Sequence, residues 1–484
     1  MSGKSTVLPN MIWKFAERFS SQIVTFVVSM ILANLLDPSD YGTVTLVMIF
    51  ITFANVFVSD GLGSALIRKS NADALDYSSV LYFNVGLSVV LYAVLYVAAP
   101  WITLFFGEGY EELTPAIRVL GIRLIFSAIN SVQQAYVSQQ MIFRKFFVST
   151  LAGVFVSAVV GIWLAYCGYG VWALVAQYLI NTIIGTLVLA VVLGKRPLLR
   201  FSFSRLKQLL GFGFGVLGVN LLITSYREFR SFLIGKFYTP NDLAFYKKGA
   251  QFPDLLTTNI NTTISAVLFP RFAQMKDDKV RIKKTAKRAV RLSFYLVAPL
   301  LFGLAAVAES FVTVFLTEKW LGCVPYIWIF CVNDIFYPIH STNMQLLKVC
   351  GDTKTLVRLE FIKKAIELVL LLIVFRWGVV WIALAMATTS TLFTYLNCIP
   401  TKKNIGYAFS EQIKDVVSPL IMCFVMFGTV FFMGKLPLTR GLLLVLQVLV
   451  GVAVYVGLSL LTRNSEFFEL LDMAKSFFKK RAKR

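Results

Sequence analysis

Long apolar stretches alternate with short polar ones along almost the whole of this 484-residue chain. An α-helix of about 20 apolar residues crosses the roughly 30 Å hydrocarbon core of a bilayer, and we predict fourteen such segments. Their predicted bounds are 11–35, 42–66, 78–105, 115–139, 146–166, 171–193, 208–234, 243–269, 289–307, 320–347, 355–375, 377–399, 413–434 and 441–462. Continuous apolar stretches are typical of membrane helices and not of an outer-membrane β-barrel. The predicted fold is therefore an all-α polytopic membrane protein.

Composition supports this fold class and excludes several kinds of site. The chain is 57% hydrophobic and only 15% charged, which excludes a soluble protein. The first apolar stretch is too long for a signal-peptide core, so we expect it to remain in the mature chain. The six cysteines show no metal-ligand spacing, and His340 is the only histidine, so a zinc site with several imidazoles is excluded. We expect no cofactor, and we expect His340 to be a polar packing residue.

Basic residues concentrate in every second loop. The formal net charge is +22, and thirty of the 47 lysines and arginines lie in loops on the side of the N-terminus, whereas five lie in the opposite loops. Because cytoplasmic loops of membrane proteins collect Lys and Arg, we expect both termini to face the cytoplasm. Positive charge spread over eight loops is typical of a protein beside lipid headgroups and argues against a nucleic-acid partner.

A repeat of about 200 residues relates the two halves of the chain. Residues 35–42 and 237–244 share Pro-x-Asp at an offset of 202, where proline sets a turn and the aspartate caps the next helix. Residues 169–174 and 377–384 share a Gly-Val…Ala-Leu pattern at an offset near 208. Duplicated halves are common in transporters. We predict an N-lobe with spans 1–6, a C-lobe with spans 7–12, two extra spans and a basic amphipathic cytoplasmic tail, at 1–195, 196–400, 401–462 and 463–484.

The tail carries apolar side chains at i, i+3 and i+4 spacing from residue 467 and ends in a polybasic run at 479–484. This pattern predicts a surface helix that binds anionic lipids.

A group of cations lies in the seventh and eighth predicted spans. Folding the hairpin about residues 238–239 places Arg230 level with Lys247, and Arg227 about one turn deeper. Lys248 follows directly, and Glu228 is the one acid close by in the sequence. Charges inside a membrane normally face a protein interior or an aqueous cavity, and a cationic cluster predicts an anionic ligand such as phosphate. The alternative is that Arg227 and Arg230 extend toward the outer interface.

Other polar residues in the spans extend this list of candidates. Lys14 and Arg18 share a polar face of the first span and would line a transport path or anchor the helix at the interface. Arg123 in the fourth span is a further candidate for the cationic cavity. Glu17 and Asp60, together with Glu228, are candidates for coupling to H⁺ or Na⁺.

Two patterns predict structure and not chemistry. Glu360, Lys363, Lys364 and Glu367 are expected to pair at i, i+4 and so neutralise one another. Residues 213–218 match Gly-x-Gly-x-x-Gly, but no strand precedes them, so we exclude a dinucleotide site. The spacing of Gly211 and Gly215 instead predicts close helix packing or a flexible bend.

Several segments resemble one known family, the Wzx-type polysaccharide flippases of the multidrug/oligosaccharidyl-lipid/polysaccharide exporter (MOP) superfamily, and within it the colanic-acid and teichuronic-acid exporter branch. The segments that carry the resemblance are Glu17-Arg18-Phe19 with Ser21-Gln22, Leu36-Asp37-Pro38-Ser39-Asp40-Tyr41-Gly42, Ser131-Val132-Gln133-Gln134, Gly168-Tyr169-Gly170-Val171-Trp172-Ala173-Leu174, and Ile234-Gly235-Lys236-Phe237-Tyr238 through Gln251-Phe252-Pro253.

The resemblance implies two six-helix lobes in a MATE-like V, around a cationic cavity that admits an undecaprenyl-diphosphate-linked oligosaccharide. Members often carry Tyr-x-Arg where this chain has Tyr246-Lys247-Lys248, and lysine keeps the charge without the bidentate geometry of arginine. We expect an exporter of the bacterial inner membrane that serves cell-surface polysaccharide assembly, such as that of lipopolysaccharide O-antigen. Expected partners are the lipid-linked oligosaccharide and other membrane proteins of polysaccharide assembly.

Two other functions compete with this prediction. A MATE-type cation-coupled multidrug antiporter would line its cavity with acids, whereas bases predominate here. A membrane-bound polysaccharide polymerase or ligase would need a large external loop with catalytic groups, and the longest predicted external connection is about a dozen residues, 308–319. We therefore expect a transporter and not an enzyme.

Overall fold

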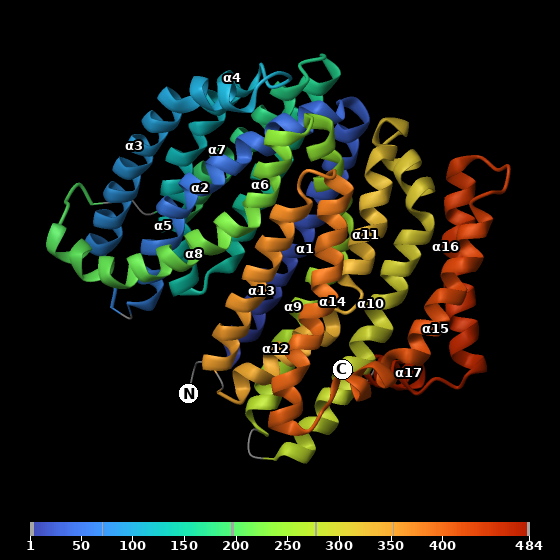
Figure 1. Ribbon diagram of the computed structural model, residues 1–484. Coiled ribbons are helices and arrows are strands. Elements are labelled where there is room, and N and C mark those ends of the chain that lie inside the picture. The colour runs from blue at the N-terminus through green and yellow to red at the C-terminus, as the bar shows by residue number, and fades with distance from the viewer. Residues whose placement is uncertain (1–3, 70, 195–197, 276–277, 352, 482–484) are drawn as a thin grey trace. The chain divides into compact units, whose positions relative to one another are not determined.

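A computed structural model describes residues 4–69, 71–194, 198–275, 278–351 and 353–481. Within these ranges the side chains of residues 4–19, 261–267, 269–270, 353, 473–474 and 476–481 lie outside the description. The described chain is helical throughout, with no strand in these ranges, and divides into two compact units, residues 1–244 and 245–484 (Figure 1). This confirms the predicted all-α class.

In its described residues unit 1 holds eight helices and the start of a ninth. They are α1 (Lys4–Leu35), α2 (Pro38–Arg68), α3 (Ala74–Phe106), α4 (Leu113–Gly121), α5 (Arg123–Gln140), α6 (Phe143–Tyr166), α7 (Val171–Leu193), α8 (Phe203–Phe237) and the first residues of α9 (Pro240–Ala273). Helix α2 packs along α8 and α5, and α6 packs along α7 and α1. A buried apolar cluster that includes Leu66, Val80, Val132 and Leu206 ties α2, α3, α5 and α8 together.

Unit 2 contains the rest of α9 and the helices that follow it. These are α10 (Lys279–Phe315), a short 3-10 helix η1 (Glu318–Cys323), α11 (Val324–Asp334), α12 (Tyr337–Val349), α13 (Thr353–Val374), α14 (Val379–Ile405), α15 (Phe409–Met433), α16 (Arg440–Leu461) and α17 (Ser465–Arg481). Its core joins α10, α12, α14, α15 and α16 around buried side chains such as Phe294, Ile339 and Tyr407.

Each of the fourteen predicted spans falls on one or more helices. In the described residues eleven helical segments are long and apolar enough to cross a membrane, and α1 contributes a shorter apolar stretch over 20–35. The fourth span is split into α4 and α5, and the tenth into η1, α11 and α12. The chain is thus a multi-span membrane protein, while the count of fourteen spans and the lobe boundaries at 195 and 400 stay predictions.

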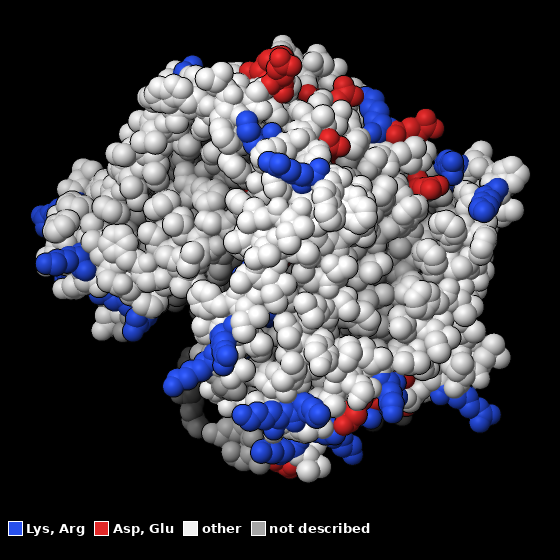
Figure 2. Space-filling view, in the orientation of Figure 1, with Lys and Arg blue, Asp and Glu red and all other residues white. Residues whose placement is uncertain are grey.

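Basic side chains gather at one end of unit 2. Figure 2 shows lysine and arginine side chains gathered at the lower end of the view, where α10 begins, with a few acidic side chains among them. This group fits the predicted excess of basic residues in alternate loops. Which end faces the cytoplasm stays a prediction.

The repeated Pro-x-Asp turn builds the same local structure twice. Helices α2 and α9 both begin at the proline, whose fixed φ suits the first turn of a helix. The Asp40 carboxylate accepts a hydrogen bond from the Asp37 N–H at 3.2 Å, and the Asp242 carboxylate accepts one from the Thr239 N–H at 3.1 Å. The predicted capping role of the two aspartates is therefore confirmed.

Glycines allow α2 and α8 to approach closely in unit 1, but these are not the glycines that the sequence pattern predicts. A Cβ on Gly211 or Gly215 would meet nothing within 4 Å, so close packing at these two residues is wrong, while a flexible bend there stays a prediction. A Cβ on Gly61 of α2 would instead lie 2.9 Å from the Gly213 carbonyl oxygen of α8. Helices α2 and α8 therefore meet at Gly61 and Gly213, and Gly213 lies between the two glycines of the predicted motif.

A polar network closes one end of unit 1. Asp73 caps α3 by accepting a hydrogen bond from the Asp76 N–H at 2.9 Å, which holds the pKa of the Asp73 carboxyl below its usual value. The buried Asp76 carboxylate pairs with Lys69 at 2.7 Å, and Arg205 at the start of α8 lies 3.5 Å from Asp73. These pairs fix the α2–α3 connection against α8.

The tail helix α17 packs against unit 2. Phe467 and Leu470 contact its apolar core, while Glu469 pairs with Arg288 and Glu466 pairs with Arg291 of α10. Part of the apolar face predicted to bind lipid is therefore used inside the protein. The polybasic run 479–484 lies outside the described side chains, so binding of anionic lipid there stays a prediction.

Candidate functional site

A large polar space lies inside unit 1. It is a chamber of about 490 Å³ between α2, α5, α6 and α7, lined by nineteen residues. Four lining residues carry amides, namely Asn55, Asn130, Gln134 and Asn181, and eight more carry serine or threonine hydroxyls. The chamber thus lies between helices that qualify as membrane spans but is lined mainly by hydrogen-bonding groups.

Helical periodicity explains why so many polar groups meet in one place. On α5 the polar lining residues are Arg123, Ser127, Asn130, Ser131, Gln134 and Ser138. This spacing of three and four residues places them on one face of the helix. On α2 the residues Asn55, Ser59 and Asp60 follow the same rule. The apolar faces of both helices are left to pack against the rest of unit 1.

Two predicted site residues, Arg123 and Asp60, lie in the chamber. The Arg123 guanidinium is held in place, because its Nε donates to Thr182 Oγ1 at 2.8 Å and its plane lies 5.9 Å from the Tyr178 ring centroid. Ser59 Oγ lies 2.9 Å from an Asp60 oxygen and also donates to the Asn55 carbonyl of its own helix. The chamber therefore holds one fixed cation and one acid.

The cations predicted from the seventh span lie on α8, also in unit 1. Arg227 Nε donates to Glu228 at 2.9 Å, and the Arg227 side chain is 60% exposed while that of Glu228 is 12% exposed. The Arg230 guanidinium lies 5.9 Å from the Tyr226 ring centroid. Arg227 is thus partly neutralised by the adjacent acid.

The cations predicted from the eighth span belong to unit 2. Lys248 is buried, and its Nζ lies 5.5 Å from the Trp320 ring centroid. Lys247 is half-buried. Since α8 and these lysines are parts of different units, the four-cation cluster stays a prediction. Lys14, Glu17 and Arg18 lie outside the residues whose side chains the structure describes.

The charges of the eleventh span form a partly buried network, with pairs that differ from the predicted ones. The i, i+4 pairing is wrong, because Lys363 contacts Glu360 and Lys364 contacts Glu367 at 3.3 Å, both at i, i+3. Lys363 Nζ also donates to Asn397 Oδ1 at 3.3 Å.

The predicted polar packing role of His340 agrees with this network. The Asn397 amide nitrogen lies 2.6 Å from His340 Nδ1, and the His340 ring stacks on Tyr337 with centroids 6.1 Å apart. The network links α12, α13 and α14.

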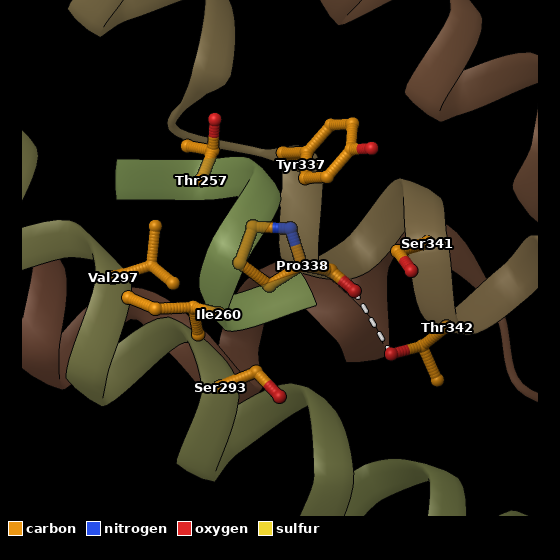
Figure 3. Close-up of a pocket in the computed structure, with 8 residues that line it drawn as sticks. All are labelled: Thr257, Ile260, Ser293, Val297, Tyr337, Pro338, Ser341 and Thr342. Carbon is orange, nitrogen blue, oxygen red and sulfur yellow. Dashed lines mark hydrogen bonds between the residues drawn. The ribbon is translucent and has the colours of Figure 1, made fainter. Parts of the chain in front are cut away.

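Unit 2 contains a very small pocket and a much larger groove. Figure 3 shows a pocket of about 10 Å³, in which Thr342 Oγ1 donates to the Pro338 carbonyl at 2.8 Å, with Thr257 and Ser293 nearby. This volume is about the minimum that one water molecule needs. A larger groove of about 820 Å³, between α10, α15, α16 and α17, is lined almost entirely by apolar side chains such as Leu300, Val448 and Leu471.

The neutral part of the chamber is not among the predicted site residues. The predicted residues are all charged, whereas the chamber is lined mostly by amides and hydroxyls. The signal was present in the sequence, since polar residues recur every three or four positions from 123 to 138 within a predicted span.

Two curated relatives cover much of the chain. It is 25% identical over 489 residues to the succinoglycan biosynthesis transport protein ExoT of Rhizobium meliloti (strain 1021), covering 97% of this chain and 96% of the relative. It is also 25% identical over 345 residues to the teichuronic acid biosynthesis protein TuaB of Bacillus subtilis (strain 168), covering 70% of each chain.

Solved structures show the same fold. The lipid II flippase MurJ in an inward closed conformation has a TM-score of 0.76 at 15% identity, covering 94% of this chain and 99% of that one. An inward-facing multidrug resistance MATE family transporter of the MOP superfamily has a TM-score of 0.62 at 16% identity, covering 80% and 94%. A family model described as polysaccharide biosynthesis protein matches residues 31–325. Because this match covers more than half of the chain and the relatives and the fold agree with it, the chain belongs to the polysaccharide biosynthesis protein family, as its resemblance to polysaccharide flippases predicts.

Proposed function

We propose that this protein is a flippase that moves undecaprenyl-diphosphate-linked oligosaccharides from the cytoplasmic to the external leaflet by alternating access. The observation that carries the proposal is the chamber of unit 1. A chain of the polysaccharide biosynthesis family places about 490 Å³ of hydrogen-bonding space between its membrane helices. Such a space lets a hydrophilic headgroup leave water without entering hydrocarbon.

The cations and the apolar groove suit the other parts of the same substrate. Arg227, Arg230 and Lys248 are proposed to hold the diphosphate, because ionised donors make the strongest hydrogen bonds to phosphate oxygens. The groove of unit 2 is proposed to receive part of the polyprenyl chain, since its lining is apolar. Both termini are proposed to face the cytoplasm, in keeping with the charge bias of the loops.

A MATE-type multidrug antiporter is the second candidate, and the fold of unit 1 and unit 2 is compatible with it. A cationic drug would need acids in its binding site. In the chamber Asp60 is the one acid among the described lining residues, and Arg123 balances it. A polysaccharide polymerase or ligase is disfavoured by the same lining, which offers no second carboxylate for acid–base work among those residues.

The test is translocation by purified protein in liposomes. A fluorescent undecaprenyl-diphosphate-linked oligosaccharide is placed in both leaflets, and a membrane-impermeant quencher reports how much reaches the outer one. We expect the protein to make nearly all of the probe accessible, whereas empty liposomes protect about half. Accessibility equal to that of empty liposomes would refute the proposal, and dye efflux in place of probe movement would favour the antiporter.

Neutral variants test the role of the cations in the same assay. Arg227→Gln, Arg230→Gln and Lys248→Met are expected to slow translocation about tenfold or more, because each lost charge-assisted hydrogen bond contributes about 1.5–3 kcal/mol. Arg118→Gln is the matched control. Its guanidinium lies 4.4 Å from the Tyr96 ring centroid, away from the chamber lining, and we expect wild-type rates.

A further inference from the structure

We infer that the chamber of unit 1 binds the sugar part of the lipid-linked substrate through neutral hydrogen bonds, and that it does not bind the diphosphate. This inference rests on the proposed function and assigns one part of the substrate to one set of residues. Asn55 and Gln134 are the side chains on which it depends most.

The charge of the chamber does not match a diphosphate. Of the nineteen lining residues that the structure describes, Arg123 carries the one positive charge and Asp60 the one negative charge. Arg123 already donates to Thr182 at 2.8 Å and lies 3.4 Å from the Met48 sulfur. A diphosphate would therefore meet a single, already engaged cation together with a repelling carboxylate.

The hydrogen-bonding character of the lining favours a ligand that donates. The Oδ1 atom of Asn55 is buried and has no partner in the described part of the chain. The Asp60 carboxylate only accepts, and Ser149 Oγ gives its proton to the Phe146 carbonyl at 2.8 Å, which leaves its lone pairs as acceptors. Phosphate oxygens also only accept, so they cannot satisfy these atoms. Sugar hydroxyls donate and accept, and so they can.

The amides and the volume fit a polyhydroxyl ring. An amide presents a donor and an acceptor side by side, which matches two adjacent hydroxyls. Gln134 and Asn130 lie one helical turn apart on α5, and Gln134 Nε2 donates to Asn130 Oδ1, so the pair offers an ordered polar surface. The volume of about 490 Å³ falls within the usual range of small-molecule sites, about 300–1,000 Å³.

The experiment compares two probes on purified protein in nanodiscs: undecaprenyl diphosphate, and undecaprenyl diphosphate carrying one glucose. The test variants are Asn55→Ala and Gln134→Ala. The control is Gln133→Ala, the neighbour of Gln134 on α5, whose Oε1 is buried without a partner among the described residues and which does not line the chamber. Binding of the bare diphosphate also reports whether each variant is folded.

We expect wild-type protein to bind the glucosylated probe more tightly than the bare one. Each test variant is expected to weaken binding of the glucosylated probe about three- to tenfold, which is the usual effect of one lost hydrogen bond, and to change the bare probe less than about twofold. Gln133→Ala should bind both probes like the wild type.

Three results would overturn the inference: no preference of the wild type for the glucosylated probe, an unchanged affinity of both test variants for it, or an equal loss on both probes. If wild-type protein bound neither probe and failed to translocate the oligosaccharide in liposomes, the proposed function itself would fall. The two failures are therefore distinguishable.

Discussion

Asn397 holds the buried polar network of unit 2 together, so its removal should destabilise that unit. The side chain is fully buried on α14. Its Oδ1 accepts a hydrogen bond from Lys363 Nζ at 3.3 Å, and its amide nitrogen lies 2.6 Å from His340 Nδ1. The Lys363 side chain is itself only 3% exposed, so water cannot readily replace the lost acceptor.

The expected cost follows from the groups left without a partner. Asn397→Ala deprives both Lys363 and His340 of a buried hydrogen bond, and each such loss costs about 1–3 kcal/mol. The sum is about 2–6 kcal/mol. At about 2–4 °C per kcal/mol for a unit of this size, the unfolding midpoint should fall by about 4–24 °C.

Asn404 provides the matched control on the same helix. Its amide nitrogen is buried and has no hydrogen-bond partner in the described part of the chain. Asn404→Ala removes the same group from α14 without breaking a hydrogen bond of that nitrogen, so its midpoint should stay within about 2 °C of wild type or rise slightly.

The cysteines supply the assay. Cys323, Cys331, Cys398 and Cys423 are buried, and all four belong to unit 2, whereas Cys167 and Cys350 are exposed. A thiol-reactive dye added during heating in detergent therefore labels two sites at once and the other four as unit 2 opens. Equal midpoints for Asn397→Ala and Asn404→Ala would show that the network does not stabilise the unit and would refute the reasoning.

Two further predictions concern unit 1. A Cβ on Gly42 would lie 1.9 Å from the Pro240 carbonyl oxygen, so Gly42→Ala must displace backbone and should lower the free energy of unfolding by about 1–3 kcal/mol or more. A Cβ on Gly86 would meet open space, so Gly86→Ala should be neutral or slightly stabilising. Thermal unfolding followed by size-exclusion chromatography compares the two variants. Asp73→Ala should lower the free energy of unfolding by about 1 kcal/mol at pH 7, because the α3 cap is lost. Since the folded-state pKa of Asp73 lies below its unfolded value near 4, this loss relative to wild type should persist above about pH 4 and shrink as the pH falls further. A constant loss of stability down to pH 3 would contradict the capping role.

Hydropathy was sufficient to predict where the helices lie, but less so to predict breaks in them. The apolar stretch 115–139 reads as one span, yet the structure separates α4 from α5 at Ile122. Helix α9 is also a helix where predicted, although it is not among the segments of the described residues that are long and apolar enough to cross a membrane. Length and periodicity predict a helix, whereas its environment depends on which elements pack around it.

Local turn chemistry could also be predicted, since it depends on neighbours in the sequence. Pro38 and Pro240 start helices as expected, and glycines with positive φ, Gly170 and Gly378, precede α7 and α14 in the second repeated pattern. The packing partners could not be predicted. Gly213 rather than Gly211 meets α2, because the choice depends on the rotation of α8 about its axis, which a glycine spacing alone does not specify.

The residues of the candidate site also differ in how well the sequence predicts them. A charge within a span is conspicuous in a sequence, so Arg227 and Arg230 are predicted directly. Neutral amides such as Asn55 become informative only when four helices bring them together. The two groups differ in chemistry as well as visibility. Cations satisfy a diphosphate, which only accepts hydrogen bonds, while a lining rich in acceptors needs a ligand that donates them. The diphosphate is common to all lipid-linked oligosaccharides and the sugar is not. Discrimination between glycans should therefore depend on the neutral residues of the chamber, and exchange of these residues between relatives should change which glycan is carried while the cations stay the same.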